Sequence, residues 1–158
     1  MGEEGAQVRS QGAGQGAPKP EAKAITGSIV LAADDPAALA RFYGALLAVP
    51  PQPGLSRTHW RVPWPAGGWL EVYGPSRSRP QPRQPGRLAL CLQQRAAGMG
   101  AVAVLNAWIT AALELGASLQ DPPRQESFGA EAWLLDPEGN RLLLLTHGAE
   151  SLEGSPPP

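Results

Sequence analysis

The sequence has little cysteine and little charge. Cys91 is the single cysteine among 158 residues, which excludes an internal disulfide and any zinc site built from several thiolates. Charged residues make up only 17% of the chain, with 13 basic residues against 14 acidic ones. Because the two signs balance, no overall positive field favours nucleic acid or an acidic membrane, and neither is expected as a partner.

The sequence also lacks a recognisable targeting or membrane-spanning segment. Residues 1–24 contain no apolar run of the kind that a secretory signal needs. The longest apolar stretch, residues 98–117, is rich in alanine and is interrupted by Asn106, Thr110 and Glu114, whereas a span needs about 20 predominantly apolar residues. We therefore expect a cytoplasmic protein in which this stretch forms a buried core helix.

Glycine and proline, by contrast, are abundant, with 19 and 18 residues. Residues 1–24 and 148–158 lack an apolar face and are predicted to be disordered tails. Residues 76–85 hold several prolines and arginines and are predicted to form a semi-rigid linker. The remaining part of the chain, residues 25–147, is long enough for one domain with a hydrophobic core.

The first half of this domain shows a strand, a helix and further strands. A β-branched apolar run over residues 25–33 predicts a strand. Asp35 and Pro36 are residue types that begin helices, and apolar residues spaced as on one helix face follow from Leu39 to Leu46. Alternating patterns then predict strands over residues 58–62 and 69–73.

The second half repeats this order. The pattern predicts a strand over residues 87–92, a helix over 102–115 that ends at Gly116, and a short strand over 118–120. A hairpin is predicted from residues 130–135 and 141–146 around the turn at 136–140. The repeated order indicates an α+β fold of two βαβββ modules, residues 25–75 and 86–147, joined by the linker.

Two segments of the chain resemble the vicinal oxygen chelate superfamily, which contains glyoxalase, bleomycin-resistance proteins and extradiol dioxygenases. The first is Ser28-Ile29-Val30-Leu31 followed by Asp35-Pro36 and Phe42-Tyr43. The second is Gly116-Ala117 with the hairpin Asp136-Pro137-Glu138-Gly139-Asn140 and a leucine-rich last strand. The resemblance covers residues 25–147 and implies two curved mixed sheets around a pocket.

Enzymes of this superfamily bind a divalent metal through residues on the first and last strands of each module. The resemblance places these ligand positions at Ser28, Glu71, Arg87 and Leu143, and only Glu71 is a metal-ligand type. A catalytic metal needs about three nitrogen or oxygen ligands, so we predict neither a metal nor another cofactor. The alternative is a relocated divalent site that combines Glu71 and His59 with Asp121 or Glu131.

Without a metal, Glu71 and Arg87 are expected to point into the same pocket and to form an ion pair. This pair has two open interpretations, either ligand binding or a closed pair that fills a dead metal site. Trp69 and Tyr73 alternate with Glu71 and are expected to form an aromatic wall beside it. Cys91 is expected to be a buried structural residue. The candidate ligand-binding residues are Ser28, His59, Trp69, Glu71, Tyr73 and Arg87.

These residues favour a metal-free protein that binds or sequesters a small-molecule ligand. The alternatives are a lyase, isomerase or dioxygenase-type enzyme of the same superfamily with an atypical metal site, and a structural remnant. A homodimer is a further expectation, because the superfamily often dimerises.

Removal of residues 1–22 and 150–158 is expected to leave the melting temperature nearly unchanged. Neither segment has an apolar face to bury, and poorly ordered termini contribute little to stability. Calorimetry of the full and the shortened chain measures the effect. A drop of many degrees in the shortened chain would show that a tail packs on the domain.

Overall fold

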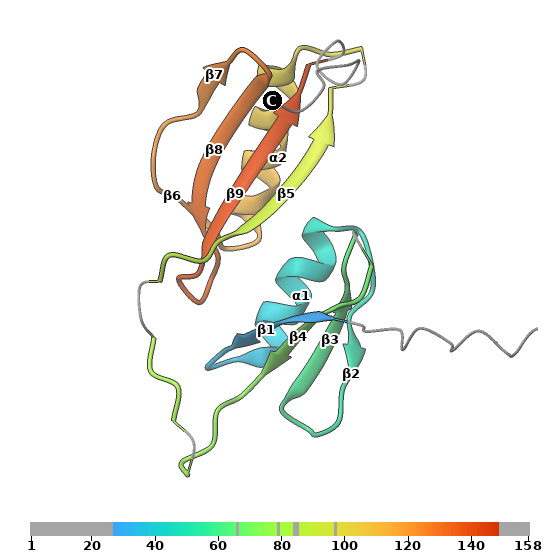
Figure 1. The fold of residues 1–158 in the computed structure, drawn as a ribbon, viewed down its shortest axis with the longest axis vertical. Coiled ribbons are helices and arrows are strands. Elements are labelled where there is room, and N and C mark those ends of the chain that lie inside the picture. The colour runs from blue at the N-terminus through green and yellow to red at the C-terminus, as the bar shows by residue number, and fades with distance from the viewer. Residues whose placement is uncertain (1–26, 66, 79, 84–85, 97, 149–158) are drawn as a thin grey trace, which may run out of the picture.

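The computed structural model describes residues 27–65, 67–78, 80–83, 86–96 and 98–148. These residues form two modules, each with one helix and one mixed sheet, which confirms the predicted α+β fold (Figure 1). The predicted tails lie outside the described residues, apart from Gly148. Within the described residues, no helix is long and apolar enough to cross a membrane.

The first module is a four-stranded sheet with one helix packed on it. The strand order is β1-β4-β3-β2, with β1 parallel to β4 and the other pairs antiparallel. Its elements are β1 (Ser28–Ala32), α1 (Pro36–Leu46), β2 (Gln52–Pro53), β3 (His59–Pro63) and β4 (Trp69–Tyr73).

The second module repeats this arrangement with one additional short strand. Its sheet has the order β5-β9-β8-β6, with β5 parallel to β9, and β7 also pairs with β8. Its elements are β5 (Leu90–Arg95), α2 (Ala101–Glu114), β6 (Ser118–Leu119), β7 (Arg124–Glu126), β8 (Gly129–Leu135) and β9 (Arg141–His147).

Both helices begin and end near the predicted residues. The Asp35 side chain caps α1 by accepting a hydrogen bond from the Ala38 amide at 2.9 Å. The second helix is followed by Gly116, whose φ of +103° is a conformation that glycine adopts readily. Of the stretch 98–117, which was expected to form a buried core helix, residues 101–114 form α2, and this helix contributes one face to the core, with Leu105, Ile109 and Ala112, while its other residues are partly or fully exposed.

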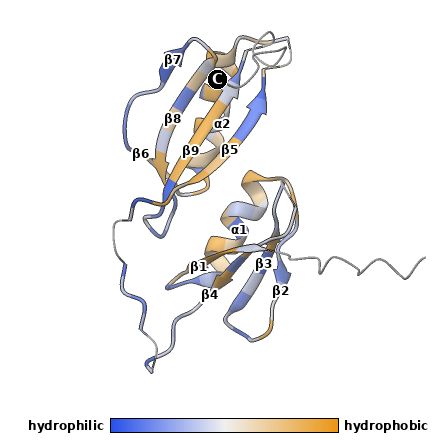
Figure 2. Ribbon diagram, viewed as in Figure 1, coloured by the Kyte–Doolittle hydropathy of each residue, from blue (hydrophilic) through white to orange (hydrophobic). Residues whose placement is uncertain are grey.

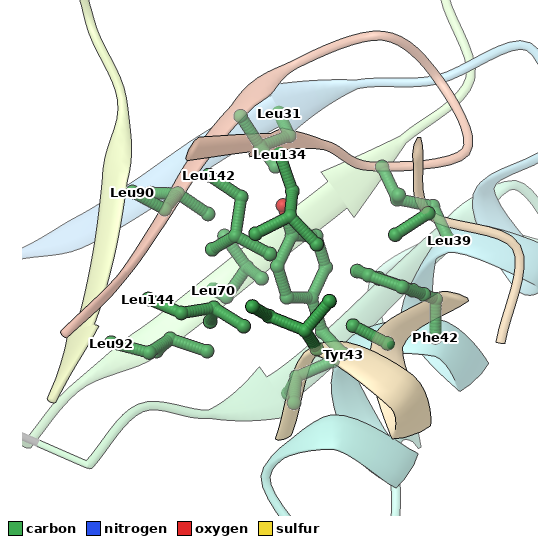
Figure 3. Packing of buried hydrophobic residues seen from close by; sticks show 14 of the residues in the cluster. Leu31, Leu39, Phe42, Tyr43, Leu70, Leu90, Leu92, Leu134, Leu142 and Leu144 are labelled. Atoms are coloured by element: carbon green, nitrogen blue, oxygen red, sulfur yellow. The ribbon is translucent and has the colours of Figure 1, made fainter. Parts of the chain in front are cut away.

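A single hydrophobic cluster joins the two modules. Strand alternation supplies it, since one face of each sheet carries the fully buried leucines and valines. Figure 2 shows apolar residues along β9 and polar residues at the end of β5. In Figure 3 the Tyr43 ring of α1 lies among leucines of both modules, including Leu70 of the first and Leu134 and Leu142 of the second.

The polar end of Tyr43 makes the most buried polar contact between the modules. Its hydroxyl donates a hydrogen bond of 2.8 Å to Oδ2 of Asp136, in the turn between β8 and β9. Asp136 also accepts hydrogen bonds from the Glu138 amide and from the backbone and side-chain amides of Asn140, at 2.8–2.9 Å. The helix of one module therefore depends on the same carboxylate that shapes the turn of the other.

Replacement of Tyr43 by Phe is expected to lower the free energy of unfolding by about 1–3 kcal/mol, because a buried acceptor loses one donor. Burial first, and then the nearby Asp136, raise the pKa of Tyr43 well above its ordinary value of 10.0. The folded state therefore keeps the phenol neutral while the unfolded chain ionises. The stabilisation is complete below about pH 10 and declines as the pH rises above it.

Urea unfolding at pH 8 and at pH 10.5 tests both statements. The wild-type chain is expected to lose stability between these pH values, and Tyr43→Phe is expected to lose less. Tyr73→Phe is the matched control, since Tyr73 is the other of the two tyrosines in the chain, and it is expected to keep the wild-type pH dependence. Equal alkaline losses in wild type and Tyr43→Phe would contradict the assignment.

Candidate functional site

Five of the six predicted ligand-binding residues share one face of the first sheet. Leu70 and Val72 of β4 are fully buried in the core, so the alternate residues of β4 lie on the opposite face. We call this surface the open face of the first sheet. The strand register adds residues of β1 and β3 to it. Of the predicted set, it carries Ser28, His59, Trp69, Glu71 and Tyr73.

Glu71 is the centre of a polar cluster on this face. Arg61 lies opposite Glu71 on β3, and its Nε donates to both carboxylate oxygens at 3.1 and 3.2 Å. The same guanidinium lies over the Trp69 ring, with its Cζ 4.4 Å from the ring centroid. Arg61 was not among the predicted residues, although alternation along β3 places it on the same face as His59.

His59 makes the second side-chain contact with the Glu71 carboxylate. Its Nε2 lies 2.8 Å from Oε2 of Glu71, and its Nδ1 accepts a hydrogen bond of 2.8 Å from the Leu55 amide. A ring nitrogen that accepts carries no proton, so the hydrogen-bond network assigns the neutral tautomer with its proton on Nε2. Gly54 makes this arrangement possible, because a Cβ at that position would collide with the His59 ring.

The predicted ion pair between Glu71 and Arg87 is absent. Strand β5 begins at Leu90 rather than at residue 87, because β9 provides parallel partners only from Leu142 onward. Arg87 therefore lies at the end of the linker, where it is exposed and forms no ion pair with another described residue. The carboxylate of Glu71 is balanced by Arg61 of its own sheet instead.

The strand registers also locate the metal-ligand positions of the resemblance. In the first module Ser28 lies two residues before Val30, which pairs with Glu71 in the strand register of β1 and β4. In the second module Leu143 pairs with Cys91, so the residue equivalent to Ser28 is Ala89 rather than Arg87. The four positions are thus a serine, a glutamate, an alanine and a leucine.

These residues do not fit a divalent metal, since Glu71 is the one ligand type among them. The single carboxylate is already bonded to His59 and Arg61. The relocated site proposed with Asp121 or Glu131 is not formed either. Among the residues that the structure describes, no three His, Cys, Asp or Glu side chains come together in a possible metal site.

The open face of the second sheet is more apolar. Cys91, Leu143 and Trp133 lie side by side on it. The expectation that Cys91 is buried is wrong, because its side chain lies on this exposed face. Partial desolvation raises the pKa of the Cys91 thiol, a hydrogen bond from Gln93 lowers it, and Glu131 raises it further. A raised pKa leaves less thiolate, so the structure gives Cys91 no activation as a nucleophile.

Cavities lie mainly along the linker and the junction of the modules. Two of about 530 Å³ are lined by β1 and the turn between β8 and β9, and one of about 770 Å³ is lined by the linker and the start of α1. One of the two smaller cavities is lined by Val30 and Ala32 at the β1 edge of the open face of the first sheet, whereas Glu71, His59 and Arg61 line none of these three. The polar cluster around Glu71 thus lies on the surface of the sheet, outside these three cavities.

A double-mutant cycle of Glu71→Gln and Arg61→Gln is expected to give a coupling free energy of about 1 kcal/mol. The value is modest because 35% of the Arg61 side chain is exposed and solvent screens the pair. The matched cycle of Glu71→Gln with Arg87→Gln is expected to be additive within about 0.5 kcal/mol. Urea unfolding measures both cycles, and equal coupling in the two would contradict the geometry.

Comparison with known proteins agrees with this architecture. A solved glyoxalase-related enzyme from Fulvimarina pelagi is 20% identical, with a TM-score of 0.62, and the match covers 78% of this chain and 88% of that one. A glyoxalase/bleomycin resistance protein from Albidiferax ferrireducens T118 is 21% identical, with a TM-score of 0.57 and coverage of 76% and 96%.

A lactoylglutathione lyase from Agrobacterium tumefaciens is 17% identical, with a TM-score of 0.50 and coverage of 86% and 100%. No curated protein sequence matches the chain significantly. The family model for the glyoxalase-like domain matches residues 28–145. This chain therefore belongs to the glyoxalase-like domain family.

Proposed function

We propose that the protein binds or sequesters a small molecule on the open face of the first sheet, in the cytoplasm and without a metal ion. One observation carries the proposal. Glu71, at the one metal-ligand position that retains a ligand type, is bonded to His59 and Arg61 at 2.8–3.2 Å. A carboxylate already held by two protein donors has fewer lone pairs left for a cation.

The chemistry of the face supports recognition rather than covalent catalysis. Arg61 is fixed by Glu71 on one side and by Trp69 on the other, so its remaining N–H donors are held in place for a ligand. Trp69 and Tyr73 lie two residues before and two residues after Glu71 on β4, and both side chains are partly exposed. They provide aromatic surface beside the polar cluster. A planar ligand with hydrogen-bond acceptors fits such a surface.

A second copy of the chain is the partner that we propose to complete the site. The open face of the second sheet carries the partly exposed side chains of Leu143, Leu145 and Trp133. Leu145 lies between Gln93 and Glu131 on this face, so its apolar part is the area around Leu143 and Trp133, and this area is a suitable cover for a planar ligand. The homodimer rests on this complementarity between an apolar and a polar face.

A screen of planar aromatic fragments by two-dimensional amide NMR tests the proposed site. Fragments that bind are expected to shift the indole N–H signal of Trp69 and to leave that of Trp108, on α2, unchanged. Trp69→Leu is expected to weaken binding about tenfold or more, since stacking contributes about 1–3 kcal/mol where aromatic planes pack. Trp108→Leu is the matched control, although its stability is checked first because Trp108 packs against the core.

Two outcomes would contradict the proposal. One is that the bound fragments shift only signals of the second module. The other is that Trp69→Leu leaves their affinities unchanged.

A further inference from the structure

A separate cavity of about 530 Å³ lies where the two modules meet, and we call it the junction cavity. It combines apolar and polar linings and shares no residue with the open face of the first sheet. A volume of this size is typical of small-molecule sites. Its principal lining residues are Leu88, Leu90, Leu135, Gln120, Asn140 and Arg141.

The leucines form an apolar wall that the chain itself leaves partly uncovered. Both Leu88 and Leu90 line the cavity. Leu90 is buried in the core, whereas Leu88 is 74% exposed. Leu135, on the open face of the second sheet, is partly exposed beside them. Contact of Leu88 and Leu135 with an apolar ligand would remove their exposed surface from water, which is favourable in proportion to the area buried.

Arg141 is the positively charged residue among those that line the cavity. Its guanidinium lies over the Trp133 ring, with Cζ 4.3 Å from the ring centroid. Stacking engages the flat face of a guanidinium and leaves the N–H donors at its edge available. Among the described residues Arg141 forms no ion pair and its side chain forms no hydrogen bond, so these donors have no partner within that part of the chain.

The carboxylates beside the cavity are occupied by other groups. Glu138, next to Gly139 in the turn, accepts hydrogen bonds from Arg83 at 2.7 Å and from the Asp35 amide at 2.9 Å. Asp34 is paired with the same Arg83 at 3.0 Å. Arg83 of the linker thus pairs with both carboxylates, and neither of them forms an ion pair with Arg141.

Arg87 adds a second positive charge near the cavity. It lies in the chain between Gly86 and Leu88, both of which line the cavity, and it is exposed. Like Arg141, it forms no ion pair with another described residue. Arg87 itself does not line the cavity, so it adds a nearby positive charge rather than a second contact group.

We propose that the junction cavity binds a small monocarboxylate with a short apolar tail. The carboxylate accepts hydrogen bonds from the edge of the Arg141 guanidinium, where planar bidentate pairing is favourable. The apolar tail packs against Leu88 and Leu135. The residues that would contact this carboxylate do not belong to the open face of the first sheet, so the ligand site is separate from the one in the proposed function; Trp133, over which Arg141 lies, also belongs to the surface proposed to form the homodimer.

Titration of the full chain with sodium hexanoate, followed by amide NMR at constant ionic strength, tests the proposal. Hexanoate is expected to shift the backbone amides of Leu88, Gln120 and Arg141 along a single saturable curve. Sodium acetate lacks the apolar tail and 1-hexanol lacks the charge, so each is expected to bind at least about tenfold more weakly.

Variants of exposed residues distinguish hexanoate binding that depends on Arg141 from unspecific attraction of an anion to positive charge. Arg141→Gln is expected to weaken hexanoate binding about tenfold or more, and Leu88→Ser is expected to weaken it by several-fold. Arg95→Gln is the matched control, since Arg95 is an exposed arginine at the opposite end of the same sheet. It is expected to leave the affinity unchanged.

Three results would overturn the proposal. The first is the absence of saturable shifts at millimolar hexanoate. The second is equal weakening by Arg141→Gln and Arg95→Gln, which would indicate unspecific attraction of an anion. The third is a set of shifts confined to Trp69 and Tyr73, which would place the carboxylate on the open face of the first sheet and leave the proposed function standing.

Discussion

The buried carboxylate of Asp136 is the contact on which the arrangement of the two modules depends. It accepts hydrogen bonds from the turn that it belongs to and from Tyr43, which lies 93 positions away in the sequence. The apolar cluster around the Tyr43 ring contributes most of the stabilisation, because apolar burial is the dominant favourable term in folding. The hydrogen bond adds direction, since it fixes which part of α1 meets the turn. The same turn carries Glu138 and leads into Arg141, so this contact also positions the linker and the junction cavity.

In the first sheet, the neighbours of the Glu71 carboxylate determine which groups it is bonded to. A glutamate at position 71 fits a metal-binding strand, and its neighbours decide what it does. Arg61 provides a positive charge across the strand pair and His59 provides a second donor. Arg61 therefore supplies a positive charge at this carboxylate from within the same sheet. The two sheets therefore differ in character, one with a polar cluster and the other with leucines at the corresponding positions.

Local sequence signals predicted the features that depend on local chemistry. Asp35 with Pro36 located the start of α1, and Gly116 located the end of α2. The repeated element order predicted the two modules. Two strands were not predicted, since β2 has two residues and β7 is Arg-Gln-Glu, and neither shows an alternating apolar pattern. Arg87 was misplaced because the register of β5 on β9 is fixed by a partner about fifty residues later. Arg61 carried a usable signal, since alternation from His59 already placed it on the site's face. The junction cavity carried none, because it forms only when the linker end, β1 and the turn come together.

The central claim is that Glu71 is bonded to protein groups in place of a metal ion. Elemental analysis by plasma mass spectrometry tests it most directly, on protein purified without chelators and dialysed against equal concentrations of zinc, nickel, manganese and iron(II). Our account predicts no divalent ion in stoichiometric amount, both in the wild-type chain and in Glu71→Ala. One ion per chain that is lost in Glu71→Ala but retained in the control Glu131→Ala would contradict it.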